Sequence, residues 1–154
     1  MREQYVEAVL AVAELIPAGS VLSYGDIAAL LESGGPRQVG AAMSAEGGAV
    51  PWWRVIRASG SAPQGHEGRA LERYRREGTA LRGDPAERPT PGRAPAWRVE
   101  MKTARWNPRE ADFVLIDAIT GRLHAADQVP GDQAPPESGG GSAAMSVPRD
   151  GLGA

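Results

Sequence analysis

The sequence predicts a mainly α-helical domain with a winged helix-turn-helix, a short strand and a wing-like loop, followed by a linker and a poorly ordered C-terminal extension. Apolar residues recur at helical spacing early in the chain, glycine and proline divide that part into short helices, and the composition changes at Gly83. A chain of 154 residues suits one domain with a tail. We expect a domain at 1–82, a linker at 83–96, a small β hairpin at 97–126 and a disordered tail at 127–154.

Three helices are predicted ahead of the strand. Residues 5–16 form the first, because their apolar positions have helical spacing: Val6, Val9, Leu10, Ala13 and Ile16. Ser23 and Asp26 have the spacing of a capping box that opens a second helix, and Pro36 suits the first position of a third. Two short helices joined by a glycine-containing turn are typical of a helix-turn-helix, although many helical hairpins share that pattern.

The third helix carries almost no side chain along Gly40-Ala41-Ala42. Glycine inside a helix costs about 1 kcal/mol relative to alanine, so a close approach by another object would explain it. That object is either another helix or the backbone or groove of DNA. Arg37 places one long cation beside this smooth surface.

Residues 50–56 are predicted to form the strand, and they contain adjacent tryptophans. Neighbouring strand residues point to opposite faces, so Trp52 and Trp53 cannot both lie in the core of a strand. Either one of them lines a surface or a pocket, or both simply pack. A polar, wing-like loop follows at 58–66, and the next helix is predicted at 67–77.

The helix at 67–77 directs Leu71 and Tyr74 inward and ends at Gly78, a natural C-cap. The formal net charge of the chain is -2, yet arginines gather between Trp53 and Gly83. These arginines either contact phosphate or form a solvated face.

The chemistry of catalysis has little support in this sequence. There is no cysteine and therefore no thiol nucleophile, and the two histidines, His66 and His124, lie far apart without carboxylates at metal-ligand spacing. We expect no cofactor and no metal. The N-terminus lacks an apolar signal region and no apolar run approaches a membrane span, so we expect a soluble cytoplasmic protein.

Short segments stand in the order and approximate spacing of a known family: Val21-Leu22-Ser23-Tyr24, Arg37-Gln38-Val39-Gly40, Pro51-Trp52-Trp53-Arg54-Val55 and Glu77-Gly78. The first 82 residues resemble the C-terminal DNA-binding domain of O(6)-alkylguanine–DNA alkyltransferases. They resemble more closely the alkyltransferase-like proteins, in which tryptophan replaces the reactive cysteine of the Pro-Cys-His-Arg-Val core.

The resemblance implies roles for the matching residues. Arg37 would enter the duplex through the minor groove and replace a flipped nucleotide, while Tyr24 would press on the phosphate of that nucleotide. Gly40 and Ala41 would let the third helix sit in the groove. The implied DNA-binding and base-flipping residues are Tyr24, Arg37, Gln38, Gly40 and Ala41, and the implied lesion pocket comprises Pro51, Trp52, Arg54, Val55 and Ser61.

Two departures from the family pattern affect these roles. Trp53 stands where the alkyltransferase has the histidine that activates its cysteine, so Glu77 has no relay to serve and is expected to be structural. The loop at 44–49 is shorter than in the family and offers no counterpart to its asparagine.

The resemblance implies non-enzymatic recognition of O(6)-alkylguanine in double-stranded DNA by a monomer that becomes nucleoid-associated when bound. Nucleotide excision repair proteins would be the downstream partners. The alternative is a winged-helix transcriptional regulator, although the third helix offers few side chains for a base code beyond Arg37 and Gln38.

Overall fold

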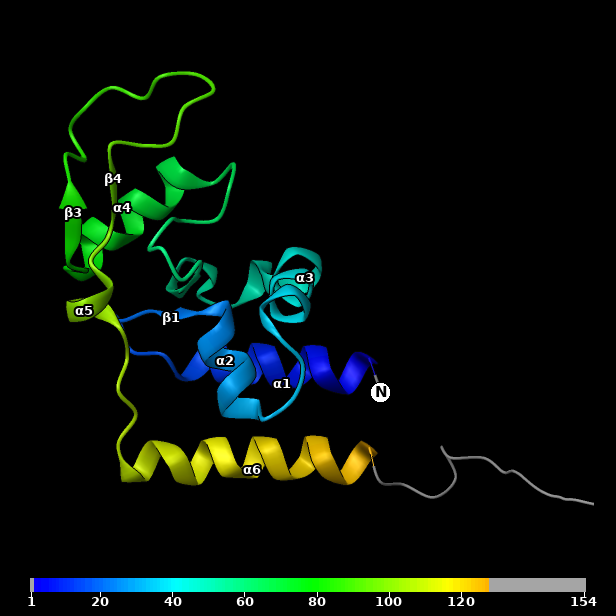
Figure 1. The fold of residues 1–154 in the computed structure, drawn as a ribbon. Helices are drawn as coiled ribbons and strands as arrows, with labels where there is room; N and C mark the ends of the chain where they lie inside the picture. The colour runs from blue at the N-terminus through cyan, green and yellow to red at the C-terminus, as the bar shows by residue number, and fades with distance from the viewer. Residues whose placement is uncertain (1, 128–154) are drawn as a thin grey trace, which may run out of the picture.

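The computed structural model describes residues 2–127, with backbone alone for Arg2 and Asp127, and the predicted tail lies outside this part except for its first residue. Figure 1 shows a helical layer at one end and a smaller hairpin unit at the other. The mainly helical fold class is confirmed. The elements are α1 (Arg2–Leu15), β1 (Leu22–Ser23), α2 (Tyr24–Leu31), α3 (Pro36–Glu46), η1 (Gly47–Ala49), η2 (Trp52–Arg54), β2 (Val55–Ile56), α4 (Glu67–Glu77), β3 (Leu81–Gly83), β4 (Trp97–Val99), α5 (Met101–Ala104) and α6 (Glu110–Asp127).

The helical layer contains α1, α2, α3 and α6, which share one hydrophobic core. The predicted capping box opens α2: Asp26 N–H donates to Ser23 Oγ at 3.0 Å, and Ser23 N–H donates to Asp26 Oδ2 at 2.9 Å. Helix α3 begins at Pro36, where a missing N–H costs nothing. Helix α1 packs against both α2 and α3, the two helices of the helix-turn-helix.

The second core lies under the hairpin unit and includes Tyr74, Trp97 and Val99. Strands β3 and β4 pair antiparallel, with Leu81 opposite Val99. Gly60 joins the 58–66 loop to β4, because its carbonyl accepts a hydrogen bond from Val99 N–H at 2.9 Å. Its φ of +91° and the 2.4 Å that would separate an added Cβ from the Val99 carbonyl oxygen require glycine at this position.

The predicted hairpin at 97–126 is wrong. Only 97–99 form a strand, and its partner is β3, so the predicted boundary at 82 divides a single hairpin. Residues 84–96 form the loop of that hairpin, not a linker between domains (Figure 1).

Residues 113–116, which lie within the predicted hairpin, belong to helix α6, which runs alongside α1 in the opposite direction (Figure 1). Ile116, Ile119 and Leu123 are its buried positions, and their spacing is helical. None of the helices within residues 2–127 combines the length and apolar character needed to span a bilayer.

The predicted strand at 50–56 is also largely wrong. Trp52–Arg54 form a 3-10 turn, and only Val55–Ile56 extend as β2. The alternation of faces that was expected to separate Trp52 from Trp53 does not occur. Both indoles are half-buried, with ring centroids 5.6 Å apart in an edge-to-face arrangement.

Candidate nucleic-acid interface

A shallow, open depression lies where the helix-turn-helix meets the end of β2. Its lining combines apolar atoms with two cations and consists of Tyr24, Pro36, Arg37, Gly40 and Arg57. Three of these residues were predicted from the sequence as DNA contacts: Tyr24, Arg37 and Gly40. The fold thus brings the central residues of the predicted site together on one surface.

The parallel pairing of β1 with β2 explains this gathering. Ser23 lies opposite Ile56 in this pairing. Tyr24 and Arg57, the residues that follow the two strands, therefore leave the sheet side by side. Arg57 is exposed, and its Nη2 donates to Gln64 Oε1 at 3.1 Å. Sequence reasoning did not assign Arg57 to the site, because strands of two residues leave no pairing signal that could be read from the chain.

At Gly40, helix α3 lies against the ring of Tyr24. A Cβ added at Gly40 would lie 3.7 Å from Cε2 of that ring, which is ordinary contact. The packing of Tyr24 therefore leaves room for a side-chain carbon and does not by itself explain the glycine. Burial raises the pKa of the Tyr24 phenol, and the positive charge of Arg57 opposes that rise.

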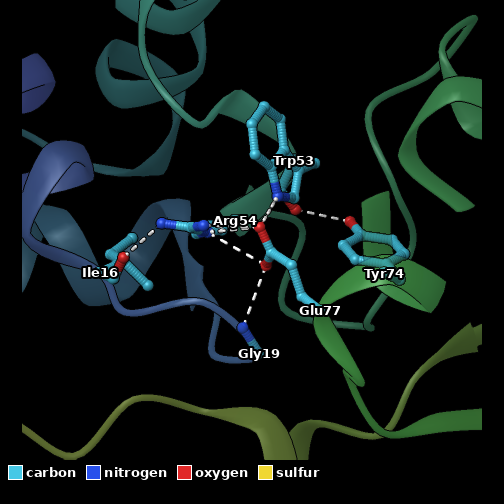
Figure 2. A network of polar contacts seen from close by, with 6 residues as sticks. All are labelled: Ile16, Gly19, Trp53, Arg54, Tyr74 and Glu77. Atoms are coloured by element: carbon cyan, nitrogen blue, oxygen red, sulfur yellow. Dashed lines mark hydrogen bonds and ion pairs between the residues drawn. The ribbon is translucent and has the colours of Figure 1, made fainter. Parts of the chain in front are cut away.

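The second part of the site is the tryptophan turn, which we define as residues 51–54. Tyr74, buried on α4, donates its hydroxyl to the Trp53 carbonyl at 2.6 Å. The indole of Trp53 donates from Nε1 to Glu77 Oε2 at 2.9 Å. Backbone and side chain of the turn are thus both fastened to α4 (Figure 2).

Glu77 is the centre of a network that joins three segments (Figure 2). Besides Trp53, its carboxylate accepts from Arg54 Nε at 3.2 Å and from Gly19 N–H at 3.0 Å. Arg54 Nη1 donates in turn to the Ile16 carbonyl at 2.7 Å. Burial raises the pKa of the Glu77 carboxyl, but the hydrogen bonds from Arg54, Gly19 and Trp53 outweigh it and hold that pKa below its ordinary value. These contacts agree with the structural role expected of Glu77.

Cationic side chains of α4 cover the indole rings. Arg73 lies over Trp53, with 4.4 Å from Cζ to the ring centroid, and Arg69 lies over Trp52 at 5.6 Å. His66 packs against Trp52 at 5.6 Å between ring centroids and contacts the Arg69 guanidinium. The α4 arginines are therefore not merely solvated, since two of them stack on the aromatic surface.

The remaining predicted site residues have different environments. Arg54 is committed to Glu77 and Ile16, and Val55 is buried in the helical core, so neither offers a surface to a ligand. Gln38 is exposed but its Oε1 accepts from Gly35 N–H at 3.0 Å, which caps α3. Ala41 is exposed on α3, whereas Pro51 and Ser61 are half-buried.

The described part of the chain shows no obvious metal site. Within residues 2–127, no group of three or more histidine, aspartate or glutamate side chains is placed to hold a metal ion. The whole sequence contains no cysteine, so this chain has no thiol that could accept an alkyl group.

Comparison with known proteins agrees with this geometry. Residues 4–79 match the family "6-O-methylguanine DNA methyltransferase, DNA binding domain". The structure of S. pombe Atl1 in complex with damaged DNA containing O6-carboxymethylguanine is similar, with 29% identity over 70% of this chain and 98% of that chain, and a TM-score of 0.54. The structure of S. pombe ATL in complex with DNA is 25% identical over 69% and 97% of the two chains, with a TM-score of 0.54.

No curated protein matches the chain. Residues 4–79 carry the family match, the fold agrees with the two S. pombe structures, and Trp52 stands where the reactive cysteine of the resembled motif would be. Residues 4–79 therefore match the DNA-binding domain of 6-O-methylguanine DNA methyltransferases, and the chain is similar in structure to the two alkyltransferase-like structures from S. pombe.

Proposed function

We propose that this protein recognises O(6)-alkylguanine lesions in double-stranded DNA and marks them for repair without removing the alkyl group. The observation that carries the proposal is the meeting of Tyr24, Arg37 and Gly40 around one surface depression. The resemblance implies these residues for nucleotide flipping, and they come from both helices of the helix-turn-helix. The S. pombe relatives, whose structures are complexes with DNA, support the same ligand class.

The energetics of flipping are compatible with binding alone. Extruding a nucleotide costs a few kcal/mol, and less where an alkylated base already pairs badly. Stacking on an aromatic ring returns about 1–3 kcal/mol per base, which roughly balances that cost. Burying a methyl group adds about 0.8 kcal/mol, so preference for the lesion should be modest for methyl and larger for longer alkyl groups.

Trp52 is the proposed stacking partner for the extruded base. Arg69 and His66 already lie against its ring, and both of these side chains are exposed. A base that stacks on Trp52 would take over part of the surface they now cover. The positive charge of Arg69 would also suit an adduct that carries a carboxylate, the kind of lesion present in the S. pombe Atl1 complex.

The deciding experiment is a binding titration on matched duplexes that carry guanine or O(6)-methylguanine, with 2-aminopurine beside the test base to report unstacking. We expect tighter binding to the lesion and a rise in 2-aminopurine fluorescence. Arg37→Ala and Tyr24→Ala should abolish both effects, while Arg122→Ala on α6 should keep them. Equal affinity for the two duplexes would contradict the proposal, and a footprint on one fixed sequence would favour a regulator instead.

Downstream of binding, we propose that nucleotide excision repair proteins recognise the occupied lesion, which is held by one copy of this protein. A chain without a thiol leaves the alkyl group in place, so repair requires another activity. A mixture of purified excision-repair recognition proteins with lesion duplex tests this step. We expect the protein to increase their retention on the duplex, and no increase would contradict the proposed handover.

A further inference from the structure

We propose that Arg57 and Tyr24 together form a phosphate clamp, in which the Arg57 guanidinium binds a backbone phosphate beside the extruded nucleotide. The inference rests on the proposed function and adds a residue that neither the motif resemblance nor the comparisons assign. It starts from the lining of the depression, where Arg57 is the one member contributed from outside the helix-turn-helix.

Geometry fixes the two partners relative to each other. In-register pairing of β1 with β2 brings Tyr24 and Arg57 out of the sheet next to each other, and adjacent strands lie about 4.8 Å apart. The hydrogen bond from Arg57 Nη2 to Gln64 Oε1 at 3.1 Å restrains the guanidinium while leaving its other N–H groups available. The clamp is therefore partly organised before DNA arrives.

The surroundings of the depression favour an anion. Arg37 is a second cation in its lining, and α3 begins at Pro36, so the positive end of that helix lies beside the depression. No carboxylate belongs to the lining. Two guanidinium groups, a phenol hydroxyl and a helix N-terminus suit a phosphodiester, whose sugar can rest on the Pro36 and Tyr24 rings.

This arrangement assigns different tasks to the two arginines. Arg37 lies on the helix that would enter the groove, whereas Arg57 directly follows strand β2, outside that helix. A cation held outside the helix in the groove can bind the backbone while the nucleotide rotates. Arg57 should therefore act through one particular phosphate and not through a diffuse attraction.

The test measures the affinity of wild type and Arg57→Gln for O(6)-methylguanine duplexes in which each phosphate flanking the lesion is replaced in turn by an uncharged methylphosphonate. On the unmodified backbone we expect Arg57→Gln to weaken binding about tenfold, the loss typical of a charge-assisted hydrogen bond. At one replaced phosphate that loss should vanish, because the partner of Arg57 has already been removed. Arg122→Gln, an exposed arginine on α6, is the matched control and should leave affinity unchanged on every duplex.

Two results would overturn the clamp: an unchanged affinity for Arg57→Gln, or the same loss on every methylphosphonate duplex. Equal thermal midpoints of wild type and variant establish that folding is intact, as expected for an exposed side chain. Failure of the proposed function has a separate readout, namely equal wild-type affinity for lesion and unmodified DNA. If the lesion preference is intact but the loss caused by Arg57→Gln is the same on every methylphosphonate duplex, only the clamp is refuted.

Discussion

The tryptophan turn and the depression around Tyr24 use their charges in opposite ways. In the turn, Arg54 and Glu77 are largely buried, with 17% and 11% of their side chains exposed, and they bind each other and the neighbouring backbone. In the depression, Arg37 and Arg57 are exposed and face open space. Charge therefore fastens the turn in position, whereas in the depression it is available for a ligand.

The largest effect is expected when the Glu77 network that holds the tryptophan turn is broken. Glu77→Ala removes the common acceptor of Arg54, Trp53 and Gly19 and leaves a mostly buried guanidinium without its counter-ion. We expect the free energy of unfolding to fall by about 3 kcal/mol, measured by urea denaturation. Glu72→Ala, an exposed position on the same helix, should change it by less than about 0.5 kcal/mol. Similar losses in the two variants would mean that the network does not hold the turn.

Trp52→Ala should separate binding to the lesion from binding to unmodified DNA. Loss of the stacking surface should weaken binding to O(6)-methylguanine duplex by about 2 kcal/mol, or roughly thirtyfold. Affinity for unmodified duplex should change little, because the cations of the depression remain. Trp52→Phe keeps a smaller ring and serves as the control, with an intermediate loss. Equal losses on both duplexes would place Trp52 in the scaffold and not in the lesion pocket.

The sequence predicted the first part of the chain well because its signals are local. The Ser23–Asp26 spacing, Pro36 and Gly78 each act within one turn of backbone, and each caps or starts a helix in the structure. Tyr24, Arg37 and Gly40 could be named from motif matches and were brought together by the fold.

What the sequence could not supply depends on contacts between distant segments. Arg57 joins the site only because β1 pairs with β2, and Glu77 acquires its role only when Gly19 and Trp53 meet it. Helix α6 falls inside the predicted hairpin because the short apolar run at 113–116 has no decisive period of its own. Its identity follows from the buried positions Ile116, Ile119 and Leu123, which lie on the helical layer.

The smallest effect concerns pH and again separates the two regions. The pKa of Glu77 is lower in the folded protein than in the unfolded chain, so its contribution to stability is complete above the ordinary carboxyl pKa of about 4.3. That contribution is lost as the pH falls through the lower folded pKa, because the Glu77 carboxyl takes up its proton at a higher pH in the unfolded chain than in the folded protein. Arg54 is the cation that faces this carboxylate, and the Tyr74 phenol, whose pKa is raised by burial and by the Glu77 charge, stays neutral over this range.

Urea denaturation of wild type and Glu77→Gln from pH 7 to pH 3 isolates this contribution, since every other carboxyl group titrates in both proteins. We expect the wild type to be more stable at pH 7 and its advantage to shrink below about pH 4.3. A constant difference across the range would show that the Glu77 charge is not what fastens the turn. The depression should show no corresponding change, because its lining contains no carboxylate and burial raises the pKa of Tyr24.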